Sequence, residues 1–415
     1  MRVFKFGGAS VKDADAVKNV VNVLQEVGYS DTLVVVSAMG KITNAMEKVV
    51  ESYFNDKDAV SGAIQEVIDY HNEILSDLFQ NPNHPVYSKV KVLFDEVKGF
   101  LAWNKSPKYA FVYDQVVCYG ELLSTTIVSS YLNEVGISNT WLDVRTLIKT
   151  DSNYRDAQVN WERTQQEVAK IDVSKLNITQ GFLGSDDNNF TTTLGREGSD
   201  YSAAILAYCL NSESVTIWKD VPGVLNADPR NFEHAQLLDK ISYREAIELA
   251  FYGASVIHPK TLQPLQRKEI PLKVKSFVRP KDSGTTVGKG NGIEPKIPCF
   301  IVKKNQVLLK LSSLDFSFIV EDNISEIFKL FHDHRLKVDL IQNSAISFSV
   351  CLDNKFRGLP PLLEELKRKF KVVCHEDVSL YTIRHFNDDS VKSLQNGKSV
   401  LVEQRGKETV QLVVK

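Results

Sequence analysis

A strand–helix–strand pattern opens the sequence and constrains its fold more than any other feature. Short apolar runs at Arg2–Phe6 and residues 32–37 predict two buried strands. Between these runs, apolar side chains recur at the spacing of a helix, at Val17, Val20, Val21, Leu24 and Val27. Two strands joined by one helix form a βαβ unit, and a parallel sheet needs helices on both faces. We therefore expect an α/β protein built on a mainly parallel sheet.

The same alternation continues along the first two thirds of the chain. Further strands are expected at 140–144, 176–179, 215–218 and 271–274, and helices at 113–135, 199–210 and 243–252. Residues 58–104 show a polar helical pattern instead, which we interpret as a helical insertion.

A change in composition near residue 280 indicates a second domain. Glycine and proline are dense between residues 280 and 298, which is typical of an exposed linker. Beyond it, strands are expected at 300–303, 307–312, 336–341, 345–352, 379–384, 399–403 and 409–414, and helices at 324–334, 362–370 and 389–394. This order is ferredoxin-like. We predict one domain over 1–296 and a smaller α+β region over 297–415, with one unit near 305–374 and a shortened second unit from 297–304 plus 375–415.

Charge and cysteine usage exclude several classes of partner and site. The chain has 50 Lys and Arg against 52 Asp and Glu, a net charge of -2, which argues against nucleic acid or an anionic membrane as a partner. Its 5 cysteines are widely spaced without a C-x-x-C pair, so we expect a cytoplasmic protein with no disulfide framework and no protein-held metal. No apolar run approaches the roughly 18 residues of a membrane span, and no signal-sequence pattern opens the chain.

Two loops with ligand-binding features follow the first two expected strands. In K-F-G-G-A-S, Gly7 and Gly8 would let the backbone and a helix N-terminus approach an anion, with Lys5 adding a positive charge. A plain tight turn is the alternative, because neither a Walker loop nor a dinucleotide fingerprint is present. In S-A-M-G-K-I-T-N, Ser37 and Thr43 are either helix caps or ligand contacts.

The segment T-T-T-L-G-R-E-G-S-D at residues 191–200 carries the strongest signal. Arg196 precedes an expected helix, where its charge opposes the helix dipole, so we expect it to bind a carboxylate or a phosphate. Asp200, in the same turn, either caps the helix or orients a metal ion or the lysine.

Two further positions carry charged groups whose roles stay open. The loop W-K-D-V-P-G-V-L-N-A-D-P-R contains Lys219, Asp220 and Arg230 and is either a scaffold or part of a site. Glu121 lies in the middle of an apolar helix, where a buried carboxylate needs a cationic partner. That partner is either an internal Lys or Arg, or the ammonium group of a substrate.

In their order along the chain, these motifs resemble those of the aspartokinase family, within the amino acid kinase superfamily. The resemblance includes KFGGAS, VSAMGKIT, YGELLST, TTTLGREGSD, the DVPG…DPR loop and FYGASVIHPKTL, and it extends to C-terminal ACT domains, which are ferredoxin-like regulatory modules. It implies an α/β/α sandwich that transfers a phosphoryl group from ATP, with Mg²⁺ bound through the phosphates, to the side chain of L-aspartate. The product would be 4-phospho-L-aspartate, in the first step of lysine, threonine and methionine biosynthesis. A homodimer through the ACT domains is also implied.

The resemblance assigns roles to the matching residues. It implies a catalytic role for Lys5 and Asp200. It implies aspartate binding by Ser37, Thr43, Glu121, Arg196, Gly198 and Ser199. It implies nucleotide binding by Lys5, Gly7, Gly8, Lys219, Asp220, Leu225, Arg230, Ser255 and Val256. An effector amino acid would bind Val338, Asp339, Gln342, Asn343 and Ser344.

Several positions depart from the family pattern. Glu197 stands where many members have Gly, and Leu225 replaces a Tyr common in some relatives. Ser255 occupies the position of a Lys that contacts the ATP phosphates in several members, for which Lys219 is a candidate replacement. Ala345 replaces an acidic residue of lysine-sensitive relatives, so the effector would be lysine, threonine or none. The alternatives to an aspartate kinase are a kinase of the superfamily that acts on glutamate, acetylglutamate or carbamate, and a non-enzymatic amino-acid sensor.

Overall fold

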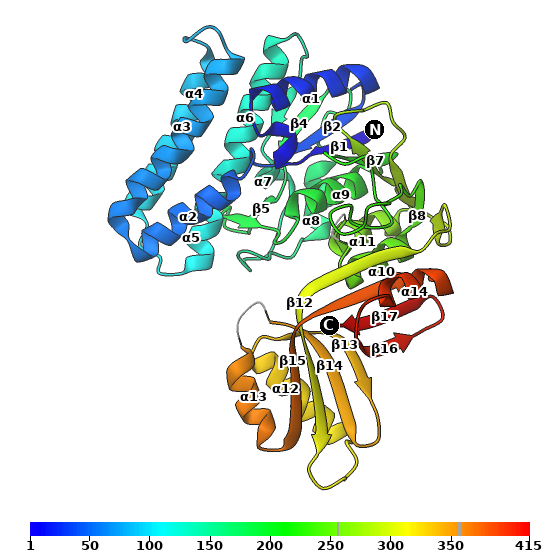
Figure 1. Cartoon of the computed structure of the whole chain (residues 1–415). Helices are drawn as coiled ribbons and strands as arrows, with labels where there is room; N and C mark the ends of the chain where they lie inside the picture. The colour runs from blue at the N-terminus through cyan, green and yellow to red at the C-terminus, as the bar shows by residue number, and fades with distance from the viewer. Residues whose placement is uncertain (255–256, 355–357) are drawn as a thin grey trace. The chain divides into compact units, whose positions relative to one another are not determined.

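The computed structural model describes residues 1–254, 257–354 and 358–415 (Figure 1). The chain forms two compact units. The first comprises Met1–Val224, Leu237–Ile247 and Ile257–Gly292. The second comprises Leu225–Gln236, the described residues 248–254, and Ile293–Lys415 apart from residues 355–357.

A mainly parallel sheet forms the centre of the first unit, which confirms the predicted α/β class. Its strand order is β8-β10-β9-β7-β1-β2-β4-β3. The strands are β1 (Arg2–Phe6), β2 (Thr32–Val36), β3 (Thr140–Leu142), β4 (Asn177–Gln180), β7 (Ser214–Lys219), β8 (Lys240–Ser242), β9 (Leu272–Ser276) and β10 (Thr285–Gly288). Strand β1 pairs in parallel with both β2 and β7, so the carboxyl ends of these three strands meet at one edge.

Helices pack on both faces of this sheet. The helices of this part of the chain, some of which pack on other helices instead of on the sheet, are α1 (Ala14–Val27), α2 (Ile42–Asn55), α3 (Val60–Leu78), α4 (Pro85–Trp103), α5 (Tyr109–Val117), α6 (Tyr119–Glu134), α7 (Val144–Leu147), α8 (Trp161–Val168), α9 (Gly198–Leu210), α10 (Tyr243–Tyr252) and α11 (Pro259–Arg267). Phe4 and Phe6 of β1 pack in one core with helices such as α1 and α6. Because side chains alternate along a strand, Lys5 points to the opposite face, and α9 packs against β1 there.

One predicted helical segment agrees with the structure, and another differs from it in detail. The insertion at 58–104 forms the long helices α3 and α4, as its pattern indicates. The helix predicted at 113–135 is two helices, α5 and α6, separated at Cys118. A short antiparallel pair, β5 (Leu183–Ser185) and β6 (Thr191–Thr193), is absent from the prediction because strands of three residues carry too little periodicity.

The prediction of an exposed linker at 280–298 is wrong for part of that stretch. Residues 285–288 form β10, which pairs with β9 and β8, and Thr285 and Val287 are fully buried. Gly284 turns the chain into this strand at φ +67, and a Cβ there would lie 2.2 Å from the carbonyl oxygen of Val274. Glycine therefore marks a tightly packed turn at this point instead of a flexible connection.

The second unit is built on an antiparallel sheet of order β13-β14-β12-β15-β17-β16. Its strands are β12 (Cys299–Ser313), β13 (Lys337–Asn343), β14 (Ser347–Asp353), β15 (Phe370–Arg384), β16 (Val400–Arg405) and β17 (Thr409–Val414), and β11 (Ile293–Glu294) precedes them. Its helices are α12 (Glu321–Asp333), α13 (Leu359–Lys367) and α14 (Asp388–Gln395). The strands predicted at 300–303 and 307–312 are one strand, β12, whose register with β15 shifts between Lys303 and Gln306.

This register shift divides β12 and β15 between two packing regions. The later part of β12 pairs with β14 and the first part of β15, over a core shared with α12 and α13. The earlier part pairs with the end of β15, which also pairs with β17, beside a core that includes α14. Two ferredoxin-like regions thus share long strands.

The loop at 225–236 groups with the second unit, although the predicted boundary at 296 places it in the first. The Phe300 amide donates a hydrogen bond to the Asn226 carbonyl at 2.7 Å, and the Asn226 side chain donates to the Pro298 carbonyl at 2.8 Å. The rings of Phe232 and Phe300 lie 5.4 Å apart. These contacts join segments that are distant in sequence, so local patterns do not reveal them. In the part of the chain that the structure describes, no helix is long and apolar enough to cross a bilayer.

Candidate active site

A cavity of about 510 Å³ opens at the carboxyl ends of β1, β2 and β7. Its lining comes from these strand ends, the starts of α2 and α9, and the helices α5 and α6. The predicted site residues among its lining are Lys5, Gly8, Ser37, Thr43, Glu121, Arg196, Gly198, Ser199, Asp200 and Lys219. Ligands of parallel α/β sheets bind at this edge, because the helix and loop starts gather there.

An ion pair between Lys5 and Asp200 lies in the cavity wall. Lys5 Nζ is 2.6 Å from Asp200 Oδ1, and the side chains are only 11% and 5% exposed. Asp200 lies in the first turn of α9, on the side of the sheet that Lys5 faces. Their pairing therefore follows from the strand alternation of β1 and the position where α9 begins.

Glu121 is a buried carboxylate with one unpartnered oxygen. It is 2% exposed, and its Oε1 accepts a long hydrogen bond from the Ala38 amide at 3.4 Å. Its Oε2 has no hydrogen-bond partner among the described residues. Burial raises the pKa of Glu121 to about 8, although the Ala38 amide and the charge of Lys5 oppose that rise. No ion pair joins Glu121 to a Lys or Arg of the described chain, which favours a substrate ammonium as its partner.

Arg196 lies on the short connection between β6 and α9. It is exposed, and it makes no ion pair with any residue in the described ranges. Glu197 follows it at φ 53, in the left-handed region, and occupies the N-cap position of α9. Asp200 is therefore not the N-cap of this helix, which removes the structural alternative for that residue.

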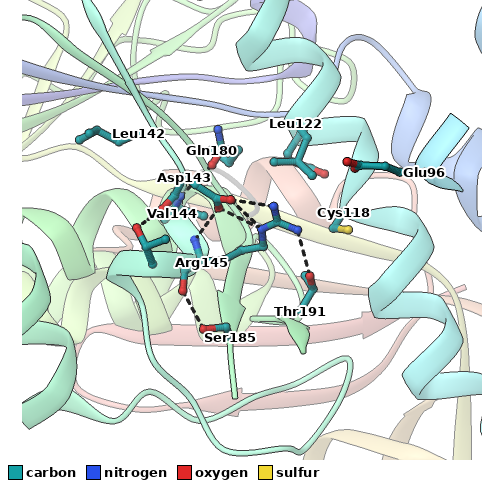
Figure 2. Close-up of polar contacts among 12 residues, drawn as sticks. Glu96, Cys118, Leu122, Leu142, Asp143, Val144, Arg145, Gln180, Ser185 and Thr191 are labelled. Atoms are coloured by element: carbon teal, nitrogen blue, oxygen red, sulfur yellow. Dashed lines mark hydrogen bonds and ion pairs between the residues drawn. The ribbon is translucent and has the colours of Figure 1, made fainter. Parts of the chain in front are cut away.

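The strand before Arg196 is held by two polar networks, one partly buried and one fully buried. Figure 2 shows one of them: Arg145 donates to the Asp143 carboxylate at 2.7–3.1 Å and to Thr191 Oγ1 at 3.3 Å. In the other, the fully buried Asp114 accepts hydrogen bonds from the amide and the hydroxyl of Thr193, at 2.9 and 2.8 Å. Burial raises the pKa of Asp114 to about 6, and its hydrogen bonds oppose the rise. Both ends of β6 are thus anchored just ahead of Arg196.

The glycines of the K-F-G-G-A-S motif have a role in packing, in addition to any contact with a ligand. A Cβ on Gly8 would lie 2.7 Å from the Gly40 carbonyl oxygen and 3.0 Å from that of Ala38, so glycine is needed where the first two loops meet. The expected helix N-terminus is wrong here, because Gly8–Val11 is a 3-10 turn and α1 begins at Ala14. Gly7 does not line the cavity, but a Cβ there would lie 3.3 Å from Lys5 Nζ.

Ser37 and Thr43 are not helix caps. Helix α2 begins at Ile42, its N-cap position is Lys41, and no side chain caps it. Both hydroxyl residues line the cavity. Gly198 and Ser199 also line the cavity at the start of α9, which packs tightly on the chain after β4, since a Cβ on Gly181 would lie 2.5 Å from that of Ser199.

The residues predicted for the nucleotide are only partly brought together. Lys219 lines the cavity at the end of β7, whereas the exposed Asp220 does not. Leu225 and Arg230 belong to the second unit, where Arg230 pairs with Asp228 at 2.8–3.1 Å. Ser255 and Val256 lie outside the described residues.

The cavity also contains residues that the sequence reasoning missed. They are Ala38, Gly40, Tyr113, Arg155, Phe182 and Gly195, together with Glu197, which was noted only as a departure. Arg155 lies in a loop with φ +73, and no sequence motif marks it. In the described chain, no group of three His, Cys, Asp or Glu side chains is arranged to hold a metal ion.

The residues predicted for an effector lie on and after β13 in the second unit. Asp339 pairs with Lys303 of β12 at 2.8 Å, and its side chain is 5% exposed. The hydroxyls of Ser344 and Ser347 lie 2.7 Å apart. Gln342, Asn343 and Ser344 are exposed, and Val338 is half-buried.

Comparisons with known proteins agree with this architecture. The sequence model of the amino acid kinase family matches residues 1–276. Lysine-sensitive aspartokinase 3 of Escherichia coli is 33% identical over 96% of this chain and 89% of its own length. A crystal structure of E. coli aspartokinase III with lysine and aspartate has a TM-score of 0.84 at 29% identity, covering 100% of this chain and 96% of that one. The same enzyme with aspartate and ADP has a TM-score of 0.79 at 29% identity and the same coverage.

Proposed function

Because this chain belongs to the amino acid kinase family, and within it to the aspartokinases, we propose that it transfers the γ-phosphoryl group of ATP to the side-chain carboxylate of L-aspartate. The product is 4-phospho-L-aspartate, which begins lysine, threonine and methionine biosynthesis. The observation that carries this proposal is the buried carboxylate of Glu121, one oxygen of which has no partner among the described residues, in the same cavity as Arg196 and the Lys5–Asp200 pair. Such a set fits a substrate with one ammonium and two carboxylates.

The reaction needs positioning and charge neutralisation more than proton transfer. A side-chain carboxylate oxygen of aspartate forms a bond to the γ-phosphorus, and the bond from that phosphorus to the bridging oxygen breaks, with its electron pair passing to ADP. The attacking carboxylate is ionised at neutral pH, so no general base is required. Lys5 stabilises the negative charge on the transferred group, and Asp200 holds the Lys5 ammonium in place.

Substrate orientation follows from the remaining charges. Glu121 binds the aspartate ammonium, Arg196 binds a carboxylate, and Ser37, Thr43, Gly198 and Ser199 complete the pocket. For the nucleotide, the proposal keeps the residues that the family resemblance implies: Gly7, Gly8, Lys219, Asp220, Leu225, Arg230, Ser255 and Val256. Mg²⁺ would arrive bound to the ATP phosphates and would neutralise part of their charge, and the buried carboxylate of Asp200, which pairs with Lys5, could orient the Mg-bound phosphates.

A direct assay tests this proposal. Purified protein is incubated with Mg-ATP and hydroxylamine, which traps an acyl phosphate as a hydroxamate, and with aspartate or glutamate in turn. We expect product with aspartate alone. Product with glutamate alone would favour another amino acid kinase, and no product with either would favour the sensor alternative.

The proposal also covers the organisation of the chain. Residues 1–296 form the kinase domain, and 297–415 form a regulatory region with ACT-like units near 305–374 and at 297–304 plus 375–415. We propose a cytoplasmic homodimer that pairs through the ACT domains. The long shared strands β12 and β15 support a regulatory region that folds as one body.

Regulation by an amino acid yields a separate prediction. An effector would bind beside Val338, Asp339, Gln342, Asn343 and Ser344, where exposed polar groups follow β13. We expect lysine or threonine at millimolar concentration to lower the activity and raise the Tm, because binding to the folded state stabilises it. Asp339→Ala removes the carboxylate and should abolish the response. If neither amino acid changes activity or melting, regulation through this site is wrong.

A further inference from the structure

Arg155 is a cavity residue with an unusual backbone. It lies in the loop between α7 and α8, and its φ of +73 falls in the left-handed region. An arginine there pays a conformational cost that glycine would avoid. Non-glycine residues persist in this region when the surroundings hold them, and such positions cluster at functional sites.

The surroundings hold this loop firmly. The backbone amide of Arg155 donates to both carboxylate oxygens of Asp114, at 3.2 and 3.0 Å. The same carboxylate binds Thr193, so Asp114 ties the Arg155 loop to the strand that leads to Arg196. The amide of Ala157 also donates to the Thr193 carbonyl at 3.0 Å. One fully buried carboxylate therefore sets the relative positions of two arginine-bearing loops.

The guanidinium of Arg155 lies among aromatic rings at the cavity wall. It is 4.4 Å from the centre of the Tyr113 ring and 5.4 Å from that of Tyr109, and Tyr113 also lines the cavity. Its ion pair with Glu47 is a single contact of 3.4 Å between side chains that are 45% and 34% exposed. An exposed pair of this kind contributes little, so the guanidinium remains available to a buried anion.

The charges of Arg155 and Glu121 both act on Tyr113. Burial raises the pKa of the Tyr113 phenol to about 12, the negative charge of Glu121 adds to that rise, and the positive charge of Arg155 opposes it. Tyr113, Glu121 and Arg155 line the same cavity. An amino acid carries its α-carboxylate on the same carbon as its ammonium group, so a guanidinium in the wall of the cavity that contains Glu121 is a candidate to bind that carboxylate.

We propose that Arg155 is a specificity-determining residue that binds the α-carboxylate of the amino-acid substrate, alongside Arg196. The inference rests on the proposed function, because it assigns a group of that substrate to a residue. Two guanidinium groups on loops tied to the buried Asp114 give a planar, directional recognition of carboxylate that a lysine would not provide.

Arg155→Gly tests the proposal with little risk to the fold, because glycine adopts φ +73 freely. We expect KM for aspartate to rise about 10-fold, with kcat changed less than about 3-fold and KM for ATP unchanged. The preference for aspartate over its α-amide, which keeps the ammonium and the side-chain carboxylate, should fall by the same factor. Tm should change little, because the relieved backbone cost is offset by the greater unfolded-state entropy of glycine and by the lost contacts with Tyr109 and Tyr113. Arg155→Asn, which also tolerates this backbone, should match the kinetic change.

Glu47→Gln is the matched control, since it removes the exposed ion pair and keeps the guanidinium. It should leave KM for aspartate unchanged. The proposal is overturned if Arg155→Gly leaves that KM unchanged, if Glu47→Gln reproduces its effect, or if aspartate and its α-amide are affected equally. Wild-type protein in the same assay distinguishes a failure of the proposed function from a failure of the role of Arg155. If the wild type does not turn over aspartate, the proposed function is refuted. If the wild type is active and Arg155→Gly has the same KM for aspartate, only the role of Arg155 is refuted.

Discussion

Replacing Lys5 with alanine is expected to lower kcat by about 10²- to 10³-fold. In the proposed reaction, Lys5, whose ammonium lies 2.6 Å from Asp200, supplies the positive charge that neutralises the transferred phosphoryl group. A preorganised charge in a partly dry cavity costs no reorganisation during the reaction, so its loss falls on kcat more than on KM. The measurement is hydroxamate formation at saturating aspartate and Mg-ATP.

The same substitution also leaves Asp200 buried without its partner. Removal of one member of a buried ion pair costs about 3–5 kcal/mol of unfolding free energy, so Lys5→Ala should melt earlier. The double variant Lys5→Met with Asp200→Asn replaces the pair by neutral groups of similar size and should recover most of that loss without recovering activity. Lys12→Ala, at an exposed lysine in the following loop, is the control and should change neither property. Near-normal kcat in Lys5→Ala would remove Lys5 from the mechanism.

Replacing Glu121 with glutamine is expected to raise KM for aspartate about 100-fold at pH 8.5. The carboxylate is 2% exposed and has a free oxygen for the substrate ammonium, and a charge-assisted hydrogen bond in such a place contributes more than an exposed one. Glutamine keeps the shape and the Ala38 contact but loses the charge, so the fold should be retained.

Glu121 should also make aspartate binding depend on pH. Its pKa of about 8 in the free protein means that the carboxyl group is mostly protonated at pH 7, whereas the ammonium needs the ionised form. KM for aspartate should therefore be lowest above pH 8 and should rise about 20-fold between pH 8.5 and pH 6.5, with a proton released on binding. The steady-state KM across this range provides the test.

Two variants test whether Glu121 is the group whose titration changes the KM for aspartate. Glu121→Gln should lose the dependence on pH, whereas Glu134→Gln, at an exposed position on the same helix, should keep it. A flat wild-type profile would show that Glu121 stays ionised in the free protein. An unchanged profile in Glu121→Gln would assign the titration to another group.

Sequence reasoning predicted the elements of the fold better than their connections. The parallel strands, the helical insertion and the later antiparallel strands all carry local periodicity, and the structure has them near the predicted positions. The linker prediction was wrong at β10, because glycine has the same signature in a packed turn as in a flexible segment. The loop at 225–236 was predicted in the first domain but belongs to the second unit, because its contacts with Pro298 and Phe300 join residues that are far apart in the sequence.

The candidate site shows the same division. The sequence analysis identified charged residues whose local surroundings are unusual for a charge, such as a carboxylate within an apolar helix. These residues are Lys5, Glu121, Arg196 and Asp200. Tyr113, Arg155 and Phe182 are ordinary in sequence, and only their place on the cavity wall marks them.

By itself, the sequence determined the α/β class, the separate C-terminal region and the charged residues of the candidate site, because periodicity and a charge in an apolar or helix-terminal context can be read from neighbouring residues. Only the tertiary structure decided that Asp200 pairs with Lys5, that Glu121 keeps an oxygen free and that Arg155 is held in a left-handed backbone by Asp114. Those outcomes depend on which faces of β1, α6 and α9 meet and on how much water their packing excludes. Pairing, burial and backbone strain are set by residues far apart in the chain, so the order of residues along it does not reveal them.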